Sequence, residues 1–488
     1  MTETNGGIGT RDAGVSLSGV RFALFSTRNL VFWIAVLAMN FTLMRPSPVD
    51  LLFIASFLIT LVYMTFFPKL EVTRRSLYLA LLLGAWAVSY FLASLPHLGE
   101  EFVAFELIAK TFAISIGLIG AFVSMTWNRR HFETFMRVYI ASCVIASILG
   151  TIGFLTQMDL LTWDGRARGL LDDPNMYGSF LIPALVFCAY FLSRGQGNKL
   201  LLSGALAIVL LGILLSFSRI AVVASLFCFL AYIFFHNRGR PRRLVMIIGG
   251  LVAAGILMFA FASLTSAEFM AKLLDRLTFA KSYDLGEEGR YHRYALVLPM
   301  IASNPIGVGV LQLEKIFPEP IHNIWLSSFV NYGWGGGISY VTLAIGSIVV
   351  SFRNYRRTKD EITIALLISL VGIVFCSTLH EGEHWRHTWL FYGLVWGLNP
   401  FNIGMGTTSQ DRRASGLRRA GERDYGCAVA LMPAPANARP FPSAARSVHA
   451  YSARPVARCP RRSPSCGSGR AWSRRASRSR QAMPCAAA

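Results

Sequence analysis

Charged residues are scarce in this sequence. Only 15% of its 488 residues are Asp, Glu, Lys or Arg, while 54% are hydrophobic and the mean hydropathy is +0.48. A soluble globular chain averages about 25% charged residues. The apolar residues come in blocks of about 20, which excludes a soluble multidomain protein, a disordered chain and a disulfide scaffold for most of the length. The short alternating segments of a transmembrane barrel are also lacking. The predicted fold class is therefore all-α, a polytopic membrane protein with about 12 transmembrane helices.

Acidic residues are fewer than basic ones, 26 against 47, and the net charge is +21. Such an excess is often a sign of nucleic-acid binding. Residues 403–488, however, hold 16 Arg, no Lys and only 3 acidic residues, so much of the excess lies there. Elsewhere the basic residues stand in short loops between apolar blocks, and we expect no nucleic-acid partner.

The segment 403–488 is rich in Ala, Arg, Pro and Ser and has neither a helical nor a strand period. Two interpretations stay open. It is a disordered basic tail that lies against anionic lipid, or it is an extension produced by reading a GC-rich gene out of frame. Neither interpretation assigns it a function.

Twelve apolar blocks predict twelve spans inside a transmembrane domain of residues 29–402. They are 29–44, 51–67, 76–95, 102–126, 133–157, 175–193, 199–215, 219–235, 243–264, 322–350, 361–380 and 387–402. Basic residues concentrate in alternate loops, so the positive-inside rule places these loops, the N-terminal segment 1–28 and the C-terminus in the cytoplasm. The one long loop on the outer side, 265–321, is expected to contain short helices.

The few basic residues of the outer side need another explanation, because a charge at a membrane boundary is costly unless it has a use. Arg166 and Arg168 precede Asp172-Asp173-Pro174-Asn175, a turn and helix-start signal in which Asn175 is expected to cap the sixth span. These side chains either bind a ligand or pair with one another.

Arg219 follows the tight turn between the seventh and eighth spans. A helix N-terminus attracts anions, and the fork of an Arg matches phosphate oxygens. The alternative is an interfacial Arg whose charged end reaches toward water.

The long outer loop carries Arg290 and Arg293, which are three residues apart and share a helical face. His322-Asn323 follows at the start of the tenth span. A His at this position can take a proton from a hydroxyl near neutral pH; alternatively it is an interfacial His beside Trp325.

These motifs, taken in order, resemble the O-antigen ligase and polymerase family of bacterial membrane glycosyltransferases. His322-Asn323, followed after nine residues by Gly333-x-x-Gly336, is similar to the signature of that family. Further similar features are Gly289-Arg290-x-x-x-Tyr294, Asn304-Pro305, Gly307-Val-Gly309, Ser218-Arg219 and Asp173-Pro174-Asn175. Tyr294 stands where the family commonly has Trp. The resemblance covers about residues 29–402.

The resemblance implies transfer of a glycan from undecaprenyl diphosphate to an acceptor hydroxyl at the periplasmic face of the bacterial inner membrane. The acceptor is lipid A–core for a ligase and a growing polysaccharide for a polymerase, and membrane lipids are further partners. His322, Arg290 and Arg219 would be catalytic. The substrate-binding residues would be Arg293, Arg166, Arg168, Asp173, Asn175 and Asn323. No metal or other cofactor is expected. A polysaccharide flippase is the alternative from another class.

His380-Glu381-Gly382-Glu383-His384 fits the H-E-x-x-H zinc pattern. That chemistry needs both His on one face of a regular helix, and Gly382 in a short loop between two spans argues against one. A polar outer-loop cluster that contacts sugar is the favoured interpretation.

Overall fold

The structure is a computed structural model that describes residues 17–43, 47–66, 74–250, 289–317 and 320–403, all within one compact unit, Met1–Ala420. The predictions for residues 1–16, for most of the tail 403–488 and for the outer loop up to residue 288 lie outside the described residues.

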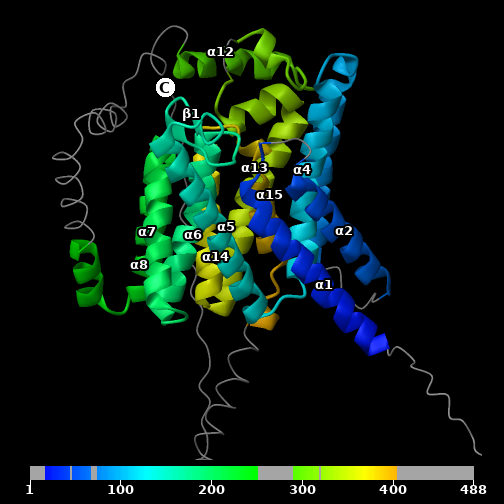
Figure 1. The fold of residues 1–488 in the computed structure, drawn as a ribbon. Helices are drawn as coiled ribbons and strands as arrows, with labels where there is room; N and C mark the ends of the chain where they lie inside the picture. The colour runs from blue at the N-terminus through cyan, green and yellow to red at the C-terminus, as the bar shows by residue number, and fades with distance from the viewer. Residues whose placement is uncertain (1–16, 44–46, 67–73, 251–288, 318–319, 404–488) are drawn as a thin grey trace, which may run out of the picture. The chain divides into compact units, whose positions relative to one another are not determined.

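Helices dominate the described part of the chain (Figure 1). They are α1 (Leu17–Leu37), α2 (Pro48–Phe66), α3 (Arg74–Ser94), α4 (Val103–Ser124), α5 (Arg129–Thr156), α6 (Pro174–Arg194), α7 (Lys199–Leu215), α8 (Arg219–Asn237), α12 (Arg290–Ser303), α13 (Ile324–Thr358), α14 (Glu361–Ser377) and α15 (Arg386–Gly397). Two short strands, β1 (Thr162–Trp163) and β2 (Arg166–Ala167), pair antiparallel. Single 3-10 turns are η1 (Ala38–Asn40), η2 (Leu95–His97), η3 (Leu313–Lys315) and η4 (Gly382–His384).

The predicted all-α polytopic membrane fold is confirmed. Eight of the described helices are long and apolar enough to cross a membrane, and α7 and α14 are shorter apolar helices of 17 residues each. The last predicted span is α15, of 12 residues. Only the first part of the predicted span 243–264 is described, and it is helical to residue 250. The number of twelve spans therefore stays a prediction.

Short polar side chains start several of these helices. Asn128, Asp173, Asn198, Asn323 and Asp360 each accept hydrogen bonds from backbone N–H groups in the first turn of the helix that follows. Such caps satisfy donors that a helix leaves without an intrahelical partner.

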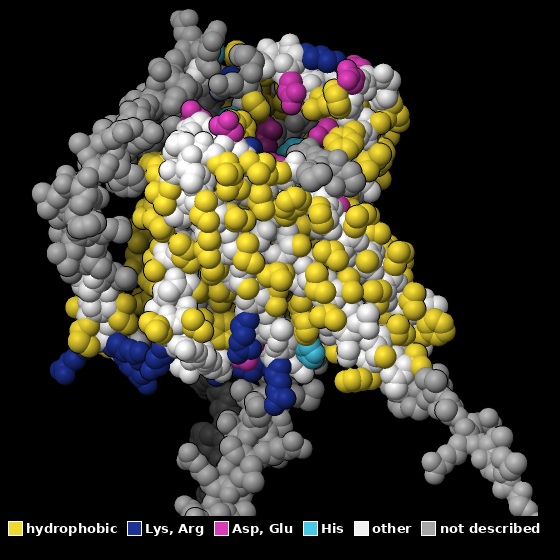
Figure 2. All heavy atoms as spheres, viewed as in Figure 1, with side chains coloured by type: hydrophobic (Ala, Val, Ile, Leu, Met, Phe, Trp, Pro, Cys, Tyr) yellow, Lys and Arg dark blue, Asp and Glu magenta, His cyan; other side chains and the backbone are white. Residues whose placement is uncertain are grey.

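The loops predicted for the two sides of the membrane gather at opposite ends of the helices. At one end, the backbone N–H of Thr42 donates to the Leu170 carbonyl oxygen (2.9 Å), and the Gln312 side-chain amide donates to the Glu100 carboxylate (2.8 Å). At the other end, Arg75 donates to Asn354 (2.8 Å). Figure 2 shows a broad apolar belt, with most Lys and Arg side chains along its lower edge and acidic side chains toward the end that holds α12. We call the end with α12 the outer end; which side of the membrane it faces stays a prediction.

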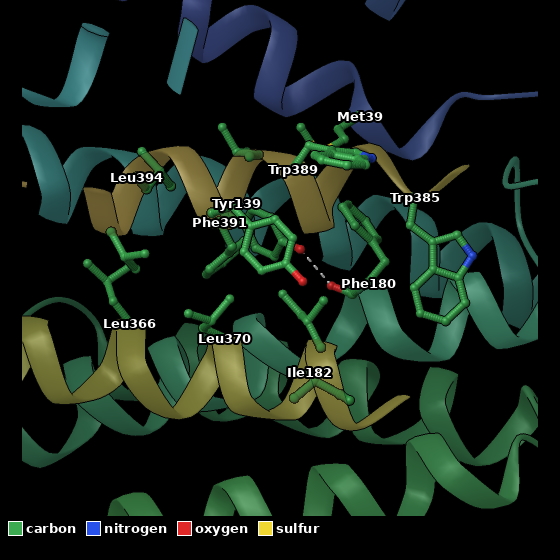
Figure 3. Packing of buried hydrophobic residues seen from close by; sticks show 14 of the residues in the cluster. Met39, Tyr139, Phe180, Ile182, Leu366, Leu370, Trp385, Trp389, Phe391 and Leu394 are labelled. Atoms are coloured by element: carbon green, nitrogen blue, oxygen red, sulfur yellow. Dashed lines mark hydrogen bonds between the residues drawn. The ribbon is translucent and has the colours of Figure 1, made fainter. Parts of the chain in front are cut away.

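Burial divides the helices into an inner and an outer set. In α6, 89% of the most apolar window is buried, against 33% in each of α1, α2 and α3. Helices α7, α8 and α14 pack against α6. Aromatic and aliphatic side chains fill the interior between α5, α6, α14 and α15, where the Tyr139 hydroxyl donates to the Phe180 carbonyl oxygen (2.9 Å; Figure 3).

Small residues allow a close contact between α4 and α15. A Cβ at Gly393 would lie 2.1 Å from the Gly117 carbonyl oxygen, and one at Gly397 would lie 2.2 Å from the Ala121 carbonyl oxygen. Transmembrane helices commonly approach through such glycines, because dispersion contacts rather than water exclusion hold them together.

Candidate functional site

The loop after α12 docks onto a break in α13. α12 begins at Arg290, whose side chain lies outside the described part, and Asn304 is its C-terminal cap. Within α13, Gly333 has φ 68° and ψ −171°, a conformation open essentially to glycine alone. The backbone N–H groups of Val308 and Gly309 donate to Val330 and Asn331 (both 2.9 Å), and Trp334 N–H donates to Pro305 (2.9 Å). Two sequence motifs, 304–309 and 333–336, thus form one packed unit.

His322 lies at the outer end, just before the cap of α13, and its backbone is left-handed (φ 54°). The Tyr294 hydroxyl donates to the His322 carbonyl oxygen (3.4 Å), which ties the first turns of α12 to this position. The His322 and His380 rings meet edge to face, with centroids 6.0 Å apart. Arg293 is buried in the first turn of α12. The structure therefore brings the start of α12 next to His322 through Tyr294.

Asn323 caps α13, with its Oδ1 accepting from the N–H groups of Trp325 (3.0 Å) and Leu326 (3.1 Å). The Trp325 indole N–H in turn donates to Thr378 (3.3 Å) at the end of α14. These contacts fix the start of α13 beside the end of α14.

Glu381 is the acidic neighbour of His322. Its carboxylate accepts a hydrogen bond from the His322 backbone. Desolvation, with repulsion from Glu383, raises the pKa of Glu381 to about 7. Near neutral pH this carboxyl is therefore poised between its protonated and ionised forms, one residue away from His380.

A second group of predicted site residues meets at the start of α8. The Arg166 guanidinium donates to the Ser216 carbonyl oxygen and to Asn175 Oδ1, both at 2.9 Å. Arg219 is the first residue of α8, as predicted, and is half-buried. Arg166 thus joins the β1–β2 hairpin to the turn that holds Arg219.

The cap of α6 is Asp173, not Asn175 as expected. Asp173 Oδ2 accepts from the N–H groups of Asn175 (3.1 Å) and Met176 (3.0 Å). Pro174 takes the first helical position, where a missing N–H costs nothing, and so the cap falls one residue before it. Desolvation raises the pKa of Asp173, although these N–H donors and Arg166 oppose the shift. Arg168 donates to the carbonyl oxygens of Asp172 (3.3 Å) and Asp159 (3.1 Å), which shapes its own loop.

Side chains of α6 and α15 connect the two groups. His387 Nε2 lies 3.2 Å from Ser179 Oγ, and its ring stacks on Trp385, 5.6 Å away between centroids. The Trp385 and His380 ring centroids are 6.1 Å apart, and the His380 ring contacts that of His322. A Cβ at Gly178, next to Ser179, would lie 3.5 Å from the Ser218 side chain, which precedes Arg219.

The stretch His380–His384 does not form the regular helix that the zinc pattern needs. It ends in η4 (Gly382–His384), so the two His do not share a helical face. Among the described residues, no group of three His, Cys, Asp or Glu side chains is arranged to hold a metal ion.

Two buried ion pairs at the outer end were not predicted. Lys110 Nζ lies 2.6 Å from Glu383, which also accepts from Tyr332 (2.7 Å). Arg386 pairs with Asp50 through two hydrogen bonds of 2.8 and 3.0 Å. The sequence feature that could have indicated these pairs is a charged residue at the edge of an apolar span, because a charge in a membrane requires a partner.

These pairs border a pocket of about 300 Å³ whose other wall is apolar. That wall consists of Ile54, Phe105, Ile108, Ala109, Phe112 and Ala113. Ile108 is 68% exposed, so the pocket lies beside the apolar belt.

Comparison with known families gives one match: residues 204–341 fit the model described as O-Antigen ligase. No curated protein matches the chain significantly. The matched segment runs from α7 into α13 and includes Arg219, Arg290, Arg293 and His322, while Arg166 and Asn175 lie before it. Residues 204–341 are thus similar to the O-antigen ligase family, which supports the resemblance that the sequence motifs indicate.

Proposed function

We propose that this membrane protein transfers a glycan from undecaprenyl diphosphate to an acceptor hydroxyl at the periplasmic face. The observation that carries the proposal is the unit formed by α12, the loop 304–309 and α13. It holds the start of α12 against His322 through Tyr294 and locks the loop onto Gly333. Tyr294, the loop 304–309, His322 and Gly333 all fall within the matched O-antigen ligase segment.

The chemistry assigns His322 as the base that takes the acceptor proton. The acceptor oxygen then bonds to the anomeric carbon, the bond from that carbon to the phosphate oxygen breaks, and its electron pair leaves with the diphosphate. A single displacement of this kind inverts the anomeric centre. The leaving group gains charge as the bond breaks, so guanidinium groups placed beside it stabilise the transition state.

Arg219 and Arg290 are the proposed partners of the diphosphate, and Arg293 is a further proposed substrate contact. The pocket between α2 and α4 contributes an apolar wall for a lipid chain. Its cations are already paired, Lys110 with Glu383 and Arg386 with Asp50, so we do not assign the diphosphate to it. Arg166 and Asn175 support the turn before Arg219. Substrate contacts of Arg168, Asp173 and Asn323 stay predictions.

The test is complementation of a gene deletion with variants, followed by gel analysis of surface polysaccharide and by transfer with purified protein. Arg219→Lys and Arg290→Lys keep the charge but lose the bidentate fork. We expect each to slow transfer by roughly 100–1,000-fold, or about 3–4 kcal/mol. His322→Ala should cost about 100–10,000-fold.

The matched control is His384→Ala, and activity should persist in EDTA. Near-normal transfer by His322→Ala, together with loss of activity in His384→Ala and EDTA, would contradict the assignment. In the deletion strain, loss of all glycan on lipid A–core identifies a ligase, and core capped with one unit identifies a polymerase. Lipid-linked glycan trapped inside the cell would identify a flippase and exclude the transferase.

A further inference from the structure

A basic cavity of about 720 Å³ opens at the end of the helices opposite His322. Arg21 of α1, Arg74 and Arg75 of α3, and Arg357 of α13 line it. Its lining residues, as far as the structure describes them, include no Asp or Glu. Four guanidinium groups around one cavity repel one another, and the N-terminus of α3 adds partial positive charge at Arg74 and Arg75. An anion in the cavity would relieve both effects.

Arg28 adds a buried charge behind the same wall. Its side chain is fully buried, and its guanidinium donates to Thr126 Oγ1 (2.6 Å) and Asn29 Oδ1 (3.1 Å). The guanidinium carbon also lies 4.9 Å from the ring centroids of Phe25 and Tyr63. Thr126, Phe25 and Tyr63 all line the cavity.

Two Arg28 nitrogens, Nε and Nη1, have no hydrogen-bond partner within the described chain. A buried charge without a counter-ion is expensive. An anion in the adjoining cavity would supply the opposite charge.

The rest of the wall indicates what kind of anion fits. Asn399 and Asn402 provide amide donors, while Phe25, Trp396 and Phe401 provide apolar and aromatic surface. Arg forks match phosphate oxygens, and basic pockets between transmembrane helices on the cytoplasmic side bind anionic headgroups. Arg130 and Arg356 at this end are exposed like Arg74 and Arg357, but they do not line the cavity.

We propose that this cavity is a binding site for a phosphate group, separate from the transferase site. The phosphate belongs either to the headgroup of an anionic phospholipid in the adjacent leaflet or to a soluble phosphate compound. The aromatic surface beside the guanidinium groups favours the lipid.

The experiment uses the full chain purified in detergent with phosphatidylcholine. Unfolding temperature and lipid retention by mass spectrometry are measured after addition of phosphatidylglycerol, further phosphatidylcholine or inorganic diphosphate. The pocket variant is Arg74→Gln/Arg357→Gln, which spares Arg75 because it bonds to Asn354. The matched control, Arg130→Gln/Arg356→Gln, loses the same charge from exposed positions at the same end that do not line the cavity.

We expect phosphatidylglycerol to raise the unfolding temperature of the wild type and the control, and to bind the pocket variant at least about tenfold more weakly. In phosphatidylcholine alone the pocket variant should be as stable as the wild type, because removing two like charges relieves repulsion. Diphosphate that stabilises the protein and displaces the lipid would identify a soluble ligand for the same site. Equal loss of binding in both double variants, or no response of the wild type to either phosphate source, would overturn the proposal.

Discussion

Replacing Gly333 by Ala tests whether the docked loop positions the catalytic residues. At φ 68° and ψ −171°, an Ala is forced into a conformation that costs about 1–3 kcal/mol. Its Cβ would also lie 2.3 Å from the Pro305 carbonyl oxygen and 2.5 Å from that of Ile306. These are backbone atoms, and hydrogen bonds from residues 308, 309 and 334 hold the loop in place.

We therefore expect Gly333→Ala to destabilise the fold by about 3 kcal/mol or to expel the loop 304–309 from α13. Either outcome moves α12, and with it Arg290 and Arg293, relative to His322. Transfer should fall by at least about 100-fold while membrane insertion persists. Gly307→Ala should act alike, because its Cβ would lie 2.4 Å from the Gly333 nitrogen.

The measurements are thermal unfolding of the purified protein and transfer activity at equal protein amount. Gly346→Ala is the control in the same helix, since its Cβ would meet only Trp396 at an ordinary 3.6 Å. Wild-type stability and activity in Gly333→Ala, or equal damage in Gly346→Ala, would refute the reasoning.

Three further predictions concern the ion pair, the acidic neighbour of His322 and the tail. Lys110→Met leaves the Glu383 carboxylate buried without its counter-ion and should cost about 3–5 kcal/mol in unfolding experiments. Adding Glu383→Gln should recover part of the loss, and a strictly additive double variant would argue against the pair. The pKa of Glu381 is higher in the folded protein, about 7, than in the unfolded chain. The wild type therefore loses stability as the pH rises from the unfolded-state pKa through about 7. Since Gln does not titrate, Glu381→Gln should gain stability relative to the wild type between about pH 5 and 8. A pH-independent difference would contradict this. Truncation after Met405 should leave membrane insertion and transfer intact, because the tail has no periodic apolar face that could be buried in a core. Loss of activity at normal expression would contradict this prediction and would argue against the frame-error interpretation.

Local signals in the sequence predicted the helices and the start of each motif. Apolar blocks predicted the helices, the turn before Arg219 lies where the sequence indicated, and Arg290 and Arg293 belong to one helix, as their spacing predicted. Such features depend on a few neighbouring residues, so the printed sequence is sufficient to find them.

Features that depend on packing were not predictable in the same way. Asp50 and Arg386 are 336 residues apart, and their pairing requires α2 and α15 to meet. The sequence places Gly333 in a motif, but the loop that packs against it is known only from the structure. The sequence did not identify Asp173 as the N-cap of α6, because both Asp173 and Asn175 are good cap residues. The position of Pro174 decides between them.

The burial of α6 has a consequence for behaviour in different membranes. Helices that face lipid accommodate a thinner or thicker bilayer by tilting or shifting. Protein surrounds α6 along most of its length, so bilayer thickness acts on it only through its neighbours. Its first turn, with Asp173 and Asn175, consequently keeps its depth relative to the turn before Arg219, which Arg166 ties to it. The start of α8 is thereby held at the depth of a helix that has little contact with lipid.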